Sequence, residues 1–515
     1  MQKGRNEAVE GAGAPAWLAR SRTYRRGAVL AASMGLLVLT PGVAWAQGGP
    51  LTLGAALARA EQHAYANRLA AGQSAERRAQ AVAPLAGVLP AVRVEAGYMR
   101  TTDPVSAFGT TLRQRQATPA AFDPALLNDP AVARGYTSGV VVEAPLLNAD
   151  AWLGRAAAKR GAAASALSEQ WTREGTRAAV VRAYWGAVLA AEQVSTLEAG
   201  VRAAREHARQ ASALVTNGMA TRSDALLAEV KAGELESKLV GSRGDALIAR
   251  RGLAVLMGTP DDTGFTLPDR LPAADGIRAY AAGQAGASGT WPLPGAAGTG
   301  ASSASGEVAE KAAPAPGAAA AVAVASLDMR ADVRAARAGV SAAEADRWRA
   351  GSRLLPRINA FGRYDWNSPL GVYDGRKSWT AGIMATWTPL PGPAEVADAR
   401  GTQARAAGAR AGAEAARANA RLEEERTATA LQVALARLDI AERGVTQAAE
   451  AHRIVARKYG GGLATVVELL DAAAAETGAR LALSSARYDA LAALADRRHA
   501  LGEDPAALAT LEDNR

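Results

Sequence analysis

The stretch Tyr459-Gly460-Gly461-Gly462-Leu463-Ala464-Thr465-Val466-Val467-Glu468-Leu469-Leu470-Asp471 decides the fold, because it joins two long Ala-rich helical runs. Glycine adopts unusual backbone angles without a Cβ penalty, so the three glycines let the chain reverse direction there. A weaker copy, Asn217 to Asp224, joins an earlier pair of helical runs. The sequence therefore predicts two similar halves, each folded back at a glycine turn.

The composition of the 515-residue chain narrows the fold class. Hydrophobic residues make up 49% of the chain, but aromatic residues only 5%. This bias favours long helices packed through small side chains over a mixed α/β enzyme. The chain has no Cys, so we expect no disulfides, no Cys-ligated zinc and no lipid anchor on an N-terminal Cys. The net charge of +9 falls to a dispersed +5 beyond residue 46, which gives little support for a nucleic-acid partner.

Residues 1–46 have the three parts of a signal peptide in the right order. Arginines between Arg20 and Arg26 form a positive region, residues 27–39 form a short apolar region, and Ala44-Trp45-Ala46 is a small-x-small cleavage site. We expect the mature chain to begin at Gln47; the alternative is a buried N-terminal helix. No later stretch is an uninterrupted apolar run of about 20 residues. An exported chain of this kind is expected to be periplasmic, secreted, or held in the outer membrane by strands.

The first half, residues 47–271, changes its hydrophobic period several times. Two-residue alternation predicts strands, and apolar residues at three- and four-residue steps predict helices. The expected order is a helix ending near Leu89-Pro90, strands at about 91–101 and 136–144 around a long loop at 102–135, a helix from Ala149 to about Leu214, and a shorter helix from about Thr221 to Met257. The 149–214 helix alone would be roughly 100 Å long at 1.5 Å per residue.

The second half, residues 326–503, has the same order behind a low-complexity linker at 272–325. Its strands are expected at about 357–367 and 378–388, followed by a helix of about 60 residues to Lys458, the glycine turn and a last helix. A C-terminal tail, 504–515, follows. The fold class predicted is mainly α with a membrane β-barrel, in duplicated helix-strand-strand-long helix-helix halves.

Aromatic residues at the ends of apolar strand faces resemble the girdles of a membrane barrel, although a small soluble sheet gives the same alternation. Four strands cannot close a barrel, and open edges in lipid leave backbone groups unsatisfied at several kcal/mol each. The strands must then combine with those of other copies, and three copies would give twelve. The candidate membrane-belt residues are Tyr98, Tyr364, Trp366, Trp379 and Trp387.

The order of these motifs resembles the outer-membrane efflux protein family typified by TolC, over residues 50–503 apart from the 272–325 linker. The motifs that carry the resemblance are Leu51 to Leu57, the Leu-Pro junctions before each first strand, Arg330 to Ala336, and Tyr459 to Asp471. The resemblance implies a homotrimer in the outer membrane that extends into the periplasm, with a 12-stranded β-barrel above an α-helical barrel. It also implies a passive conduit for tripartite efflux or type I secretion, served by a periplasmic adaptor protein and an inner-membrane pump. The alternative is a soluble periplasmic coiled-coil adaptor, which has no use for four amphipathic strands.

The glycine turns are the candidate functional site. A reversal between two long helices must lie at the far end of the tube from the strands, so we expect the tips to contact the adaptor through Gly218, Met219, Gly462 and Leu463. Glu468 and Asp471 share a helix face, and in a trimer they become six carboxylates around one axis. The resemblance implies a cation-attracting periplasmic gate, formed by Asp224, Tyr459, Glu468 and Asp471. The alternative is a solvated acidic patch. A basic residue that family members can carry after the tip glycine is Ala464 here, which removes the partner for a salt-bridge latch.

The sequence gives little support for an enzyme. The histidines at 63, 207, 452 and 499 are scattered without metal-ligand spacing, and we expect them on helix surfaces. The Gly460 to Gly462 run is not followed by Gly-Lys-Ser/Thr and is not preceded by a strand, so it is not a phosphate loop. No cofactor, metal or catalytic residue is predicted.

Overall fold

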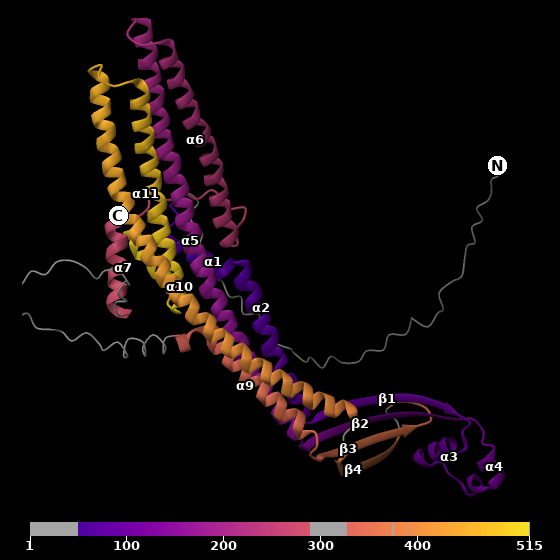
Figure 1. Cartoon of the computed structure of the whole chain (residues 1–515). Helices are drawn as coiled ribbons and strands as arrows, with labels where there is room; N and C mark the ends of the chain where they lie inside the picture. The colour runs from indigo at the N-terminus through magenta and orange to yellow at the C-terminus, as the bar shows by residue number, and fades with distance from the viewer. Residues whose placement is uncertain (1–49, 289–326, 373–374, 391, 514–515) are drawn as a thin grey trace, which may run out of the picture. The chain divides into compact units, whose positions relative to one another are not determined.

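The computed structural model describes residues 50–288, 327–372, 375–390 and 392–513 (Figure 1). The expected signal peptide, 1–46, and most of the expected linker lie outside the described residues. The described residues are mainly helical with one small sheet, as predicted. No helix in these ranges has the length and apolarity needed to cross a membrane.

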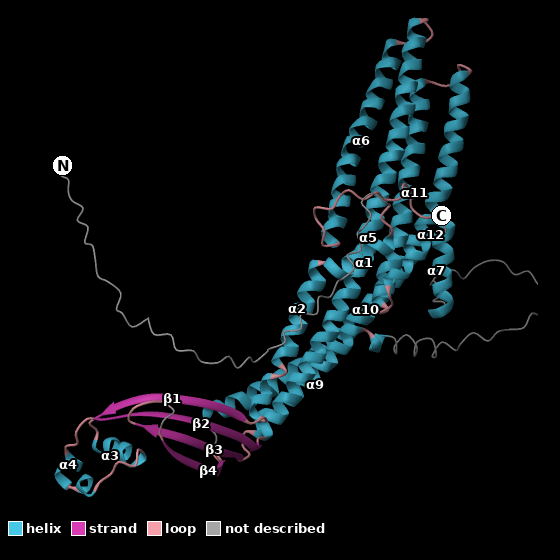
Figure 2. Cartoon of the chain, turned by 180° about the vertical axis from the view of Figure 1, so that it is seen from behind, coloured by secondary structure: helices cyan, strands magenta, loops and turns pink. Residues whose placement is uncertain are grey.

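Two long helical hairpins dominate the fold. Helix α5 (Ala149–Thr216) turns into α6 (Arg222–Leu256), and α10 (Pro393–Gly460) turns into α11 (Val466–Ala500). Each outgoing helix has 68 residues and each returning helix has 35. Helix α11 packs against α5, so the two hairpins lie side by side (Figures 1 and 2).

The lower parts of the hairpins are covered by shorter helices. Helices α1 (Leu53–His63) and α2 (Tyr65–Gln80) pack on α5, as does the 3-10 helix η1 (Ala83–Gly87), whereas α9 (Ala331–Ser352) packs on both α5 and α10. The largest core cluster forms where α1, α5 and α11 meet. Trp185 and Tyr184 of α5 are fully buried in it, together with Leu491 and Leu494 of α11.

A four-stranded antiparallel sheet in the order β1-β2-β3-β4 joins the two halves. Its strands are β1 (Ala91–Thr101), β2 (Ala133–Leu147), β3 (Arg357–Ser368) and β4 (Arg376–Thr386). The central pairing, β2 with β3, connects residues more than 200 positions apart. Strand β2 runs through Pro145, where the register shifts, so it is longer than expected.

The expected loop at 102–135 is wrong in part, because it contains the helices α3 (Pro104–Arg113), η2 (Pro119–Phe122) and α4 (Pro124–Asn128). Asp103 and Asp123 cap α3 and α4 with their side chains. In each case proline occupies the first turn, where its missing N–H costs no hydrogen bond. Pro104 and Pro124, which predicted a loop, therefore lie in the first turns of short helices.

Two other segments are more ordered than the sequence suggested. Helix α7 (Ala274–Ser288) occupies the start of the expected linker, and its Ile277 is fully buried in the core. The C-terminal segment forms η3 (Pro505–Ala509) and α12 (Thr510–Asp513). The Glu512 carboxylate accepts a hydrogen bond of 2.8 Å from the backbone N–H of Leu53, which fastens this segment to the start of α1.

Candidate functional site

The two hairpin turns have the same backbone geometry. Gly218 and Gly462 have φ values of +72° and +74°, a left-handed conformation that other residues adopt only with strain. In the second turn, the N–H of Leu463 donates to the carbonyl of Lys458 at 2.8 Å, and the N–H of Gly462 donates to Tyr459 at 3.0 Å. These bonds satisfy the last carbonyls of α10 and end the helix.

The returning helices begin with matching capping boxes. The Thr221 side chain accepts from the N–H of Asp224, and the Asp224 carboxylate accepts from the N–H of Thr221 at 3.1 Å. Thr465 and Glu468 exchange the same pair of bonds at the start of α11, where Glu468 accepts from Thr465 at 2.9 Å. The spacing Thr-x-x-Asp/Glu, a known helix start signal, is visible in the sequence at both turns.

The capping boxes give Asp224 and Glu468 a role in helix formation. A carboxylate near a helix N-terminus is stabilised by the helix dipole as well as by the hydrogen bond. In both boxes the carboxylate acts only as a hydrogen-bond acceptor. Asp224 and Glu468, two of the four candidate gate residues, are therefore held at fixed positions beside their turns.

The structure brings some of the candidate gate residues together but not others. Tyr459 packs against the buried cluster that contains Val466 and Leu470. Burial together with the nearby Asp224 charge raises the pKa of its phenol, which is neutral at ordinary pH. Asp471 is exposed on α11. Within the described ranges, no hydrogen bond or ion pair joins Glu468 or Asp471 to Asp224 or Tyr459.

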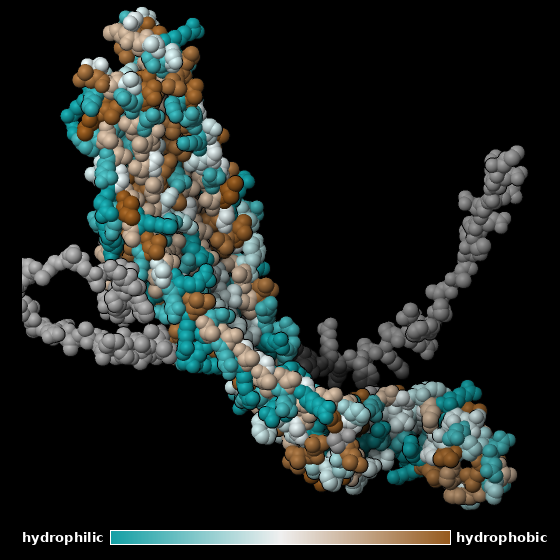
Figure 3. Space-filling model, viewed as in Figure 1, coloured by the Kyte–Doolittle hydropathy of each residue, from teal (hydrophilic) through white to brown (hydrophobic). Residues whose placement is uncertain are grey.

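Large apolar side chains are exposed at the turns. Met219 is 68% exposed and Leu463 is 81% exposed. Figure 3 shows hydrophobic residues on the surface at the hairpin ends. An exposed apolar tip on a helical hairpin is typical of a contact surface for another protein.

The candidate belt residues lie at two ends of one face of the sheet. Tyr364 is directly opposite Trp379 in the β3–β4 register, and Trp366 is two residues further along the same face. The Tyr98 ring of β1 lies 4.9 Å from the Tyr136 ring of β2 at the same end, tilted by 46°. Trp387 follows β4 at the other end and donates from its indole N–H to the carbonyl of Leu354 at 3.1 Å.

Three of the four histidines expected on helix surfaces are only partly exposed, and each of these three contacts another ring. His207 of α5 and His452 of α10 lie edge to face with ring centroids 6.2 Å apart. His499 stacks on Trp171 at 4.1 Å, and burial lowers its pKa. The pairing of two hairpins sets which helix faces meet, and a linear sequence does not contain that information. His63 is exposed, as expected.

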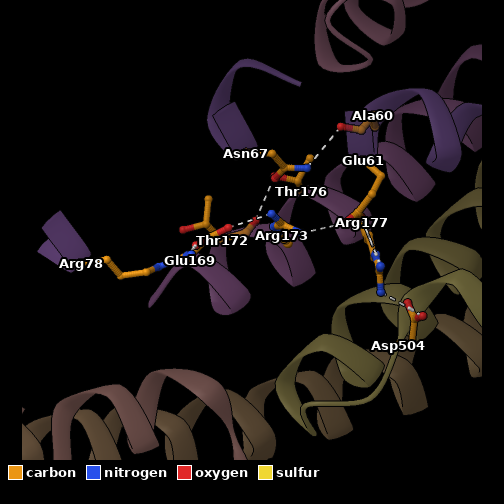
Figure 4. A network of polar contacts seen from close by, with 10 residues as sticks. All are labelled: Ala60, Glu61, Asn67, Arg78, Glu169, Thr172, Arg173, Thr176, Arg177 and Asp504. Atoms are coloured by element: carbon orange, nitrogen blue, oxygen red, sulfur yellow. Dashed lines mark hydrogen bonds and ion pairs between the residues drawn. The ribbon is translucent and has the colours of Figure 1, made fainter. Parts of the chain in front are cut away.

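Away from the turns, a charged network fastens the shorter elements to α5 (Figure 4). Arg177 donates to Glu61 of α1 and, at 3.1 Å, to Asp504 just before η3. Arg173 donates to Glu61 and, at 2.7 Å, to Glu169 one turn earlier. Every charge in this network has a partner, so we assign it to the stability of the fold.

The fold is that of a mainly helical protein in which two long hairpins continue from a small sheet. The family model for outer membrane efflux proteins matches residues 57–259 and 322–503, and the chain belongs to that family. It is an outer-membrane channel component of efflux systems, located in the outer membrane and extending into the periplasm. This confirms the resemblance found in the sequence.

Solved structures of channels share the fold at low sequence identity. VceC of Vibrio cholerae is 18% identical with a TM-score of 0.68, over 88% of this chain and 96% of that chain. CmeC of Campylobacter jejuni is 14% identical with a TM-score of 0.68, over 90% and 89%. The open state of MtrE from Neisseria gonorrhoeae is 19% identical with a TM-score of 0.65, over 88% and 90%. A comparison with curated proteins gave no match.

Proposed function

We propose that three copies of the chain form a passive export conduit, with a 12-stranded β-barrel in the outer membrane and an α-helical barrel in the periplasm. The observation that carries this proposal is the four-stranded sheet, in which β1 and β4 each pair on one side only within the described residues. Unpaired edges in lipid are too costly to remain open. Pairing β4 of one copy with β1 of the next satisfies both edges.

The two faces of the sheet support this arrangement. One face carries apolar side chains that are largely exposed, among them Val94 at 68% and Ile383 at 70%. The opposite face carries the ion pairs Arg93–Glu143 and Arg363–Glu95. In the proposed barrel the first face contacts lipid, together with the belt residues, and the second lines the channel.

The trimer is tested by native electrophoresis of the outer-membrane fraction. We expect a trimer-sized band that dissociates on heating. A soluble periplasmic adaptor would appear as a monomer in the periplasmic fraction, so the same experiment distinguishes the channel from a soluble adaptor. The conduit needs no catalytic residue, because the inner-membrane pump supplies the energy.

The proposed domain organisation is a signal peptide at 1–46, structural repeats at 47–271 and 326–503, a linker at 272–325 that begins with α7, and a C-terminal segment at 504–515. The proposed partners are a periplasmic adaptor and an inner-membrane pump. The adaptor contacts the tips at Gly218, Met219, Gly462 and Leu463.

We further propose that Asp224, Tyr459, Glu468 and Asp471 form the periplasmic gate. Glu468 and Asp471 are one turn apart on α11, and threefold repetition places six carboxylates around the axis. Rings of carboxylates select cations in pores. The neutral phenol of Tyr459 beside Asp224 offers a hydrogen-bond donor to an acidic neighbour.

The capping box allows a sharp test of the gate. Gln retains the capping bond of Glu468 but removes its charge, so Glu468→Gln with Asp471→Asn changes electrostatics without unwinding α11. We expect weaker cation selectivity and weaker block by multivalent cations in single-channel recordings. Asp245→Asn, at an exposed position on α6, is the control and should change neither property. Unchanged selectivity and block in the double variant would leave both acids as a solvated patch.

A further inference from the structure

The His207 and His452 rings bring two imidazoles close together, one from each hairpin. His207 is 11 residues before Gly218 on α5, and His452 is 10 residues before Gly462 on α10. An ion held at about 2.0–2.1 Å from one nitrogen of each ring requires ring centroids roughly 5–6.4 Å apart, depending on the angle at the metal. The observed separation of 6.2 Å lies near the upper end of this range, which corresponds to a wide N–metal–N angle.

One nitrogen on each ring lacks a partner. His207 Nδ1 and His452 Nε2 are buried, and neither has a hydrogen bond within the described part of the chain. A buried nitrogen without a partner is costly, and it is rare unless a water, an ion or a function accounts for it. These two nitrogens belong to neighbouring rings on different hairpins.

Glu476 of α11 prepares His452 for metal binding. Its carboxylate lies 2.5 Å from His452 Nδ1. A proton on Nδ1 then leaves the Nε2 lone pair free, which is the arrangement of the carboxylate–histidine–metal sites.

A cavity adjoins one of the two histidines. His452 and Glu476, but not His207, line this cavity of about 310 Å³ between α5, α6, α10 and α11. Lys231, Lys238 and Arg480 also line it, and their charges weaken the binding of a dication. No group of three or more His, Asp or Glu side chains in the described ranges is placed to hold a metal. A site here therefore has two protein ligands and is labile.

We propose that His207 and His452 bind a Zn²⁺, Cu²⁺ or Ni²⁺ ion together, with Glu476 orienting His452 and water completing the coordination. Imidazole ligands suit these three metals. The bound ion links α5 to α10 and so joins the two hairpins near their turns. The site is separate from the proposed gate and does not depend on the export function.

The test measures metal binding by the purified full-length trimer in detergent. Titration calorimetry with Zn²⁺ should give one ion per protomer, and the electron paramagnetic resonance of bound Cu²⁺ should show coupling to two imidazole nitrogens. His207→Gln and His452→Gln should each lose this binding, and Glu476→Gln should weaken it by about tenfold. His63→Gln removes an exposed histidine and should bind as the wild type does.

Amide hydrogen exchange distinguishes metal binding from a purely structural role of the two histidines, because only metal binding makes the exchange depend on Zn²⁺. Saturating Zn²⁺ should slow the amide exchange of the wild type in the turns flanking His207 and His452, and should have no effect in His207→Gln. Unchanged Zn²⁺ stoichiometry in both histidine variants would overturn the proposal. So would a wild type that binds no Zn²⁺, in which case water alone satisfies the two nitrogens.

Discussion

Among the described residues, Arg330 is the most deeply buried charged residue. Its side chain is 1% exposed, lies over the Trp171 ring, and donates to Asp332, Glu423 and the carbonyl of Ala500. Arg330→Met should lower the free energy of unfolding by about 3 kcal/mol, because it leaves two carboxylates and a helix-end carbonyl without their donor. Chemical denaturation of the detergent-solubilised protein measures this. Arg337→Met, which breaks a partly exposed pair between α9 and Asp328 just before it, should cost at most about 1 kcal/mol.

His499 makes stability depend on pH in a defined direction. Burial is the main cause that lowers its pKa below the usual 6.5, and the nearby Arg330 charge acts in the same direction. As the pH falls through about 6.5, the unfolded state gains a proton that the folded state does not bind, so stability is lost. We expect the melting temperature to fall between roughly pH 7 and pH 5, and to fall less in His499→Gln. An equal slope in the variant would mean that other groups cause the loss.

At the scale of elements, the sequence predicted the long helices and the strands because their periods are sustained over many residues. Helix α5 begins at Ala149, as expected, and β1 begins at Ala91. Helices α3 and α4 were missed because their Asp-Pro starts also signal turns, and α7 was missed because its composition matches the linker around it. Short elements of this kind owe their structure to packing, which the local sequence does not contain.

The glycine turns allow an element-scale prediction about the adaptor contact. A Cβ at Gly462 would meet nothing within 4 Å, so the cost of a substitution comes from its φ of +74°. Gly462→Val should strain the turn by about 1–2 kcal/mol and reshape the tip, whereas Gly462→Asn fits the left-handed conformation. We expect reduced efflux for the Val variant at normal trimer abundance and near-normal efflux for the Asn variant. Full efflux in both variants would argue against contact between this turn and the adaptor.

At the scale of the whole molecule, the family and the fold class were predictable from the order of the motifs, but the candidate site was predictable only in part. The sequence placed Asp224 and Glu468 beside the turns, and the structure adds that both cap helices there. The proximity of Tyr459 to Asp224, and of His207 to His452, depends on how one hairpin packs against the other. That packing is set by the core between α5 and α11, hundreds of residues apart in sequence.

The trimer is tested most directly at the sheet edges. The chain contains no Cys, so introduced cysteines are the only thiols. Val94 of β1 and Ile383 of β4 are exposed on the apolar face, and in the proposed barrel those edge strands meet between neighbouring copies. A disulfide requires Cα atoms about 4.4–6.8 Å apart, so only residues in register across the junction can form one. We therefore pair Val94→Cys with cysteines at successive apolar-face positions of β4, including Ala381, Ile383 and Ala385.

One of these pairs should oxidise to a covalent ladder that stops at three copies, because a closed ring uses every edge. The single variant Val94→Cys is the control and should remain monomeric on denaturing gels, since its partner strand then carries no thiol. A ladder that continues past three copies would indicate an open or larger assembly. If no pair along β4 cross-links in outer-membrane preparations, these two strands do not meet and the barrel is closed by other edges.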